Sequence, residues 1–134
     1  MNPERDIAVP CVSLVRPATA AGVRAIRRSI SVFAEANGAS GDGLAAIELA
    51  VSEAVANVVV HAYPEGPGEV RVAADVESGE LEVVVVDDGA GFRPGPAPGL
   101  GLGLGLMRQG AAAFEVRDRS LGGVEVWLRF ALDG

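Results

Sequence analysis

The sequence predicts an α+β fold in which two helices precede two β-hairpins. Apolar residues recur at helical spacing in residues 19–63, whereas apolar and polar residues alternate in the segments on either side of Gly79 and of Gly122. Clusters of Gly and Pro separate these segments and mark the turns between them. A chain of 134 residues can enclose one hydrophobic core but not two, so we expect a single domain over residues 1–134.

The composition excludes several classes of function. The formal net charge is −7 and no stretch is strongly basic, so direct nucleic-acid binding has little electrostatic support. All 11 basic residues are Arg, which excludes a Walker A loop and a Schiff-base enzyme, since both need a lysine. His61 is the only histidine, which excludes a His-rich metal site and a phosphoacceptor-histidine domain. Phosphate would have to be bound by backbone N–H groups, Arg or a metal.

The sequence favours a cytoplasmic protein. No apolar run approaches the 18 or so residues that a membrane span requires. The first ten residues lack the basic-then-apolar layout of a signal peptide, and the single Cys11 cannot form an internal disulfide.

The first strand and helix are predicted over residues 7–37. Ile7 to Val15 is predicted to be a strand that is broken by Pro10 and closed by Pro17, and these prolines favour the edge of a sheet. Thr19 is suited to cap a helix that ends at Asn37-Gly38. Its expected core-facing residues are Val23, Ile26, Ile30 and Phe33. Arg24, Arg27 and Arg28 lie off this stripe, and we interpret them as a solvated face, with a partner-docking surface as the alternative.

The second helix is the centre of the functional prediction. It starts at Ser40 or Asp42, ends before Pro64, and carries Glu53, Asn57 and His61 at i, i+4 and i+8. The surrounding residues are almost all apolar, which predicts a helix buried on most sides. Buried polar groups without partners are costly, so the polar stripe is expected to face a polar cavity. Hydrogen bonds from these side chains to neighbouring backbone are the alternative.

Two hairpins complete the predicted sheet. Val70 to Val76 and Leu81 to Val86 flank a turn at residues 77–79. Residues 83–86 are four consecutive valines, which predicts burial on both faces of that strand. The second hairpin covers residues 114–130, turns at Gly122-Gly123, and alternates as a half-buried hairpin does.

Glycine-rich segments follow the strand that ends at Val86. Asp87 stands at the strand exit with Gly89 and Gly91, which places a carboxylate where a ligand can approach the backbone; an ordinary turn is the alternative. Residues 92–102 contain too much Pro and Gly for regular structure and are interpreted as a mobile lid. Gly103 to Arg108 opens a short helix, whose free N–H groups suit a polyphosphate. A glycine-rich linker is the alternative here.

The order of these motifs resembles that of a known family. SEAVANVVVHAY, DDGAG and GLGLMR resemble the three boxes of the Bergerat-type ATP-binding fold of histidine kinases, gyrase B, heat-shock chaperones and MutL. The resemblance is greatest to the anti-sigma factor serine/threonine kinases. It implies a two-layer sandwich with a mixed, mostly antiparallel sheet and helices on one face.

The resemblance also assigns roles to individual residues. Glu53 corresponds to the catalytic base, Asn57 to the Mg²⁺ ligand, and Asp87 to the acceptor of the adenine amino group. Asp88 is the variable position and is expected to point to solvent. The ATP-binding residues implied by the family pattern are Asn57, Asp87, Gly89, Gly91, Gly103, Leu104, Gly105 and Leu106.

The implied function is that of an anti-sigma factor kinase. Such a protein uses ATP and Mg²⁺, binds a sigma factor, and phosphorylates a small anti-anti-sigma antagonist; relatives commonly form homodimers. The alternative is a module that binds ATP and sequesters a partner without turnover. It is motivated by Val124, where relatives usually have Thr, and by a lid whose only cation is Arg93. A third, remote alternative is an orphan catalytic domain acting on a separate phosphoacceptor-histidine protein.

Overall fold

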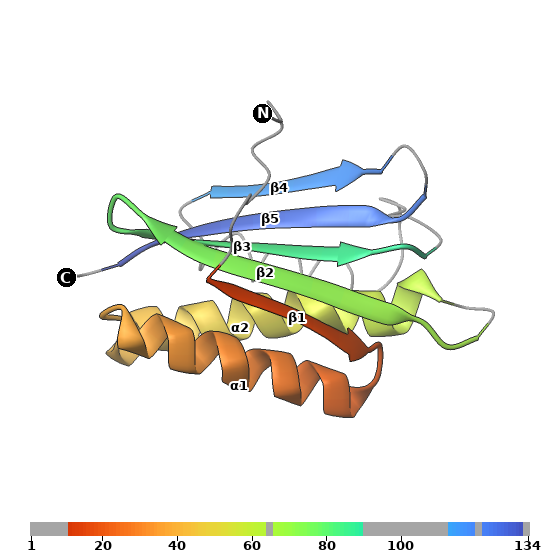
Figure 1. Cartoon of the computed structure of the whole chain (residues 1–134), viewed down its shortest axis with the longest axis horizontal. Coiled ribbons are helices and arrows are strands. Elements are labelled where there is room, and N and C mark those ends of the chain that lie inside the picture. Colours follow the sequence, from red (N-terminus) through yellow and green to blue (C-terminus); the bar gives the residue numbers. More distant parts are fainter. Residues whose placement is uncertain (1–10, 64–65, 90–112, 120–121, 133–134) are drawn as a thin grey trace.

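A two-layer α+β arrangement is seen in the computed structural model, which describes residues 11–63, 66–89, 113–119 and 122–132. Within these residues, five strands form one sheet in the order β1-β2-β3-β5-β4, and both α-helices cover the same face (Figure 1). The elements are β1 Val12–Pro17, α1 Ala20–Ala36, α2 Gly41–Asn57, π-helical η1 Val58–Ala62, β2 Glu69–Glu77, β3 Glu80–Asp87, β4 Ala113–Asp118 and β5 Val124–Ala131. The predicted fold class is confirmed. The pairings among these strands are antiparallel.

The first strand lies at an edge of the sheet, as its prolines predict. β1 pairs with β2 alone, in a register that places Val12 opposite Ala74 and Pro17 opposite Glu69. The strand continues two residues beyond the predicted end at Val15, and residues 7–10 of the predicted strand lie outside the described residues.

Helix α1 agrees closely with the prediction. The Thr19 hydroxyl accepts a hydrogen bond from the Gly22 N–H at 3.1 Å, which caps the first turn. Gly38 follows the last turn with φ +105°, a conformation that suits glycine. Ile26 and Ile30 are buried, and Val23 and Phe33 are partly buried against the same core. The three arginines of the helix, Arg24, Arg27 and Arg28, are exposed, as expected of a solvated face.

Helix α2 corrects two expectations. It is buried on one side rather than on most sides, since Leu49 is 44% exposed and Val60, in η1, is 67% exposed. The α-helical pattern also ends at Asn57 and widens into the π-helical turn η1, so His61 does not continue the i, i+4, i+8 stripe. An i→i+5 turn inserts an extra residue, and such insertions are often found at functional sites. The buried residues of this segment are Ile47, Ala50, Val51, Ala54, Val55, Val58 and Ala62.

The helical segment from Gly41 to Ala62 is long and apolar enough to cross a membrane, by length and composition alone. Its buried residues belong to the hydrophobic core and α2 contacts β3, and helices that pack against a core commonly have this composition.

Strand β3 lies in the middle of the sheet, between β2 and β5. Val83, Val84 and Val85 are buried, so the prediction of burial on both faces is confirmed for these three, whereas Val86 is only partly buried. The β2–β3 turn has positive φ at both Ser78 (54°) and Gly79 (76°), as in type I′ hairpins.

Trp127 in β5 departs from the simple alternation predicted for the second hairpin. It lies on the face of the sheet away from the helices, yet it is only 5% exposed. The Arg117 guanidinium stacks over its ring at 5.5 Å, and the indole N–H donates to Glu125 at 2.9 Å. Arg117 of the neighbouring strand β4 and Glu125 of β5 itself therefore contact this ring on the face of the sheet away from α1 and α2.

Two helical glycines provide a matched test of this arrangement. Gly22 and Gly43 both occupy the third position of their helices, but a Cβ at Gly22 would lie 2.0 Å from the Pro17 carbonyl oxygen, whereas a Cβ at Gly43 meets nothing within 4 Å. We expect Gly43→Ala to raise the free energy of unfolding by about 0.5–1 kcal/mol and Gly22→Ala to lower it by about 1–3 kcal/mol, measured by urea denaturation. Equal effects of the two substitutions would contradict the close approach of α1 to β1.

Candidate functional site

Asp87, the last residue of β3, is the buried acidic side chain of the described chain. It is 5% exposed and lies opposite Val124 in the β3–β5 ladder. Its Oδ1 accepts a hydrogen bond from the Gly89 N–H at 2.8 Å. The position of this carboxylate at the end of a buried strand agrees with the sequence analysis, whereas its hydrogen bond with the Gly89 N–H was not predicted.

The environment of Asp87 disfavours its charge. Burial raises the pKa of Asp87, an effect that the Gly89 N–H opposes and the neighbouring Asp88 carboxylate adds to. Within the described parts of the chain, no arginine forms an ion pair with the Asp87 carboxylate. The Arg119 charge lies close enough to oppose part of the shift but is not paired directly with the carboxylate, and such a buried acceptor is suited to bind a ligand N–H group.

The turn after β3 lies against the end of the helix that carries Glu53 and Asn57. A Cβ at Gly89 would lie 2.0 Å from the Ala62 carbonyl oxygen, so these backbones are in close contact. The Asp88 N–H, next to Gly89, donates to the hydroxyl of Tyr63, the residue after Ala62, at 3.0 Å. The structure therefore brings the second predicted motif against the end of the first.

The polar residues of the central helix differ in their exposure. Glu53 and Asn57 are partly buried, whereas His61 is exposed in η1. The Asn57 carboxamide offers one neutral oxygen to a hard cation. Among the described residues there is no group of three or more His, Cys, Asp or Glu side chains placed to hold a metal ion. Magnesium in proteins usually has phosphate oxygens and water among its ligands, and a single neutral oxygen at Asn57 is compatible with this preference.

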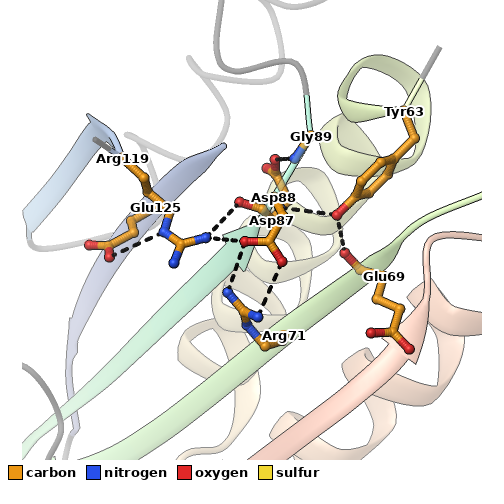
Figure 2. A network of polar contacts seen from close by, with 8 residues as sticks. All are labelled: Tyr63, Glu69, Arg71, Asp87, Asp88, Gly89, Arg119 and Glu125. Atoms are coloured by element: carbon orange, nitrogen blue, oxygen red, sulfur yellow. Dashed lines mark hydrogen bonds and ion pairs between the residues drawn. The ribbon is translucent and has the colours of Figure 1, made fainter. Parts of the chain in front are cut away.

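Asp88 is exposed, as expected, with a side chain that is 57% exposed. It also forms ion pairs that were not predicted, with Arg71 of β2 and Arg119 of the β4–β5 turn (Figure 2). Tyr63, Arg71 and Arg119 were not recognised as site residues from the sequence. They are separated from Asp88 by 25, 17 and 31 residues, and no local pattern signals contacts over such distances.

Several predicted residues lie outside the described chain. They are the lid, residues 92–102, with Gly91, Gly103, Leu104, Gly105 and Leu106. Val124, which departs from the pattern expected from the sequence, is 5% exposed and pairs with Asp87 in the β3–β5 ladder, so an apolar residue lies opposite the acidic one.

The family of the chain follows from comparison with known proteins. Residues 16–130 match the histidine kinase-like ATPase domain. The chain belongs to this family.

Curated relatives of this ATPase-domain chain include the serine-protein kinase RsbW of Bacillus cereus strain AH187 and that of Bacillus thuringiensis strain Al Hakam. Each is 36% identical over 76 residues, which is 57% of this chain and 48% of the relative. The chain thus spans about half the length of the curated relatives it matches. A crystal structure of the RsbU and RsbW domains of Rv1364c from Mycobacterium tuberculosis is similar in fold, with a TM-score of 0.71 and 22% identity over 90% of this chain and 31% of that one.

The pKa of Asp87 gives a test of the site. Because burial raises this pKa in the folded state, the ionised carboxylate opposes folding at neutral pH. Asp87→Asn removes the charge but keeps an oxygen for the Gly89 N–H, so we expect a higher midpoint of thermal unfolding at pH 7. The difference should shrink as the pH falls toward the unfolded carboxyl pKa, about 3.9. A variant that is less stable than wild type at pH 7 would contradict this account.

Proposed function

We propose that the chain binds Mg-ATP and transfers its γ-phosphoryl group to a serine or threonine of a partner protein, as an anti-sigma factor kinase. The observation that carries the proposal is the buried Asp87 carboxylate at the end of β3, held against the end of the helix with Glu53 and Asn57. Membership of the histidine kinase-like ATPase family and the serine-protein kinase names of the relatives support it.

The proposed roles follow from the chemistry of each side chain. Asp87 accepts a hydrogen bond from the adenine amino group and repels the carbonyl oxygen that guanine has in its place. Asn57 holds Mg²⁺ through its carboxamide oxygen, and the ion neutralises phosphate charge as the phosphoryl group moves. Because Asn57 is neutral, it adds no repulsion toward a triphosphate.

Glu53 is the proposed base. The partner hydroxyl oxygen forms a bond to the γ-phosphorus while the bond to the β–γ bridging oxygen breaks. The hydroxyl proton passes to the Glu53 carboxylate, and ADP leaves. Glu53 lies one helical turn before Asn57, so base and metal ligand are neighbours on one helix. We further propose that this takes place in the cytoplasm, with a sigma factor as the sequestered partner, an anti-anti-sigma protein as the phosphoryl acceptor, and a homodimer as the assembly.

A second candidate is an ATP-binding module that sequesters its partner without turnover. The apolar Val124 opposite Asp87 favours it, because one polar contact to nucleotide or water is lost there. The partly buried Glu53 favours the kinase, since a binding module has no need of a base. Phosphoryl transfer decides between the two.

The metal role is tested by calorimetric titration of ATP with and without Mg²⁺. In the wild-type protein, we expect Mg²⁺ to increase the affinity for ATP. In Asn57→Ala, this increase should fall by about tenfold, because the ion loses its protein oxygen ligand. An Mg²⁺ effect of the same size in both proteins would remove Asn57 as a ligand.

The base role is tested by phosphoryl transfer from Mg-ATP to the cognate antagonist. We expect Glu53→Gln to slow transfer by about 10²- to 10⁴-fold while ATP affinity is kept. The matched control is Glu48→Gln on the same helix, whose carboxylate accepts a hydrogen bond from Ser31 at 2.6 Å. Transfer by the control should be unchanged. Wild-type rates in Glu53→Gln would assign the proton to another group, and acid-labile phosphate on the partner would indicate a histidine acceptor.

A further inference from the structure

Residues 17 to 31 positions away in the sequence meet at Asp88. Its backbone N–H donates to the Tyr63 hydroxyl at 3.0 Å, and that hydroxyl donates to the Glu69 carbonyl oxygen at 2.6 Å (Figure 2). A Cβ at Gly68 would lie 2.3 Å from the Tyr63 ring, so the ring is closely packed against the start of β2. The main chain at Asp88 is thereby joined to the residue that follows η1 and to β2.

The Asp88 carboxylate joins two arginines. Arg71 of β2 contacts both oxygens, with Nη2 to Oδ1 and Nη1 to Oδ2 each at 3.2 Å. The Arg119 Nη1 contacts Oδ1 and also donates to the Asp87 carbonyl oxygen at 3.3 Å. The hydrogen bond from Arg119 and the charge of Arg71 lower the pKa of Asp88, so this carboxylate is ionised throughout the neutral range.

Arg119 is itself fixed to the neighbouring strand. Its backbone N–H donates to the Gly123 carbonyl oxygen at 3.0 Å, and its Nε lies 4.0 Å from Glu125 of β5. A Cβ at Gly123 would lie 1.9 Å from the Asp87 carbonyl oxygen, so this turn is in direct contact with the main chain of Asp87. Asp87 is therefore held between the β4–β5 turn on one side and the Tyr63 end of the helix on the other.

We propose that Asp88 is a positioning residue, which with Arg71 and Arg119 fixes the main chain at Asp87 and so orients the Asp87 carboxylate toward an adenine base. This inference rests on the proposed binding of ATP. The ion pairs are partly exposed, with side-chain exposure of 43% for Arg71 and 27% for Arg119, and exposed pairs contribute little to stability. Their loss should therefore change the geometry of the site more than the stability of the fold.

The test is the ratio of ATP to GTP affinity, measured by calorimetric titration. A misplaced Asp87 weakens its hydrogen bond to adenine and weakens its repulsion of guanine. In Asp88→Asn, we expect ATP affinity to fall about three- to tenfold and the ATP-to-GTP ratio to fall by at least as much. This ratio does not depend on the fraction of protein that is folded. Arg119→Gln removes contacts to both Asp87 and Asp88, so it should lower the ratio at least as far.

The matched control is Glu82→Gln. Glu82 lies in β3, five residues before Asp87, which corresponds to about 17 Å at about 3.3 Å per residue. Its carboxylate lies 3.7 Å from the Arg129 guanidinium of β5, so it too forms an ion pair. Both affinities should stay at wild-type values in this variant. In an Asp87→Asn background, Asp88→Asn should change the ratio less than it does in the wild type, since the carboxylate that Asp88 positions is replaced there by a neutral carboxamide.

The possible outcomes separate the two proposals. Absence of ATP binding by the wild-type protein would contradict the proposed function and, with it, the positioning role. Normal wild-type binding with an unchanged ratio in Asp88→Asn would overturn the positioning role alone. An undiminished effect of Asp88→Asn in the Asp87→Asn background would also overturn it, because Asp88 would then act on the nucleotide independently of Asp87.

Discussion

The central position of β3 is the constraint on which the rest of the structure depends. A strand between two others is covered on both edges, and here three successive valines are buried on its two faces. The residue that ends such a strand is buried with it, even when that residue is acidic. Asp87 is therefore placed in a poorly solvated position by the sheet, and the raised pKa follows from its location. The turns that contain Gly89 and Gly123 contact the main chain on either side of the buried Asp87 carboxylate.

Much of the fold could be predicted from the sequence because its signals are local. Alternation located the hairpins, the Thr19 cap and Asn37-Gly38 bounded α1, and the prolines indicated an edge strand. The local pattern at Asp87, an acidic residue and glycines after a run of valines, also fits an ordinary turn, and its position after the helix motif and the family resemblance singled it out. The positions predicted in residues 91–106 stay predictions, as they lie outside the described chain.

The rest depended on contacts that no window of sequence contains. The sequence around Asp88 predicts only an exposed turn residue. Its ion pairs with Arg71 and Arg119 form because β2 and the β4–β5 turn lie beside it in the fold. Trp127 reads as an outward residue, yet a cross-strand arginine covers its ring. The change from α2 to η1 is equally hidden, because a run of valines fits either helical geometry. In each case contacts between elements that are distant in sequence, or a change in helical geometry, determined a feature that the local pattern does not contain.

The close contact between Gly89 and Ala62 bears on how distant homologues are classified. The space that a side chain at residue 89 would need is filled by the protein's own carbonyl group, so a glycine is required there by the scaffold. Selection for a stable fold would keep this glycine even in a lineage that had ceased to use nucleotide. A conserved glycine at this position is therefore a marker of shared ancestry and architecture. Retained biochemical activity has to be judged from the acidic residue two positions before it.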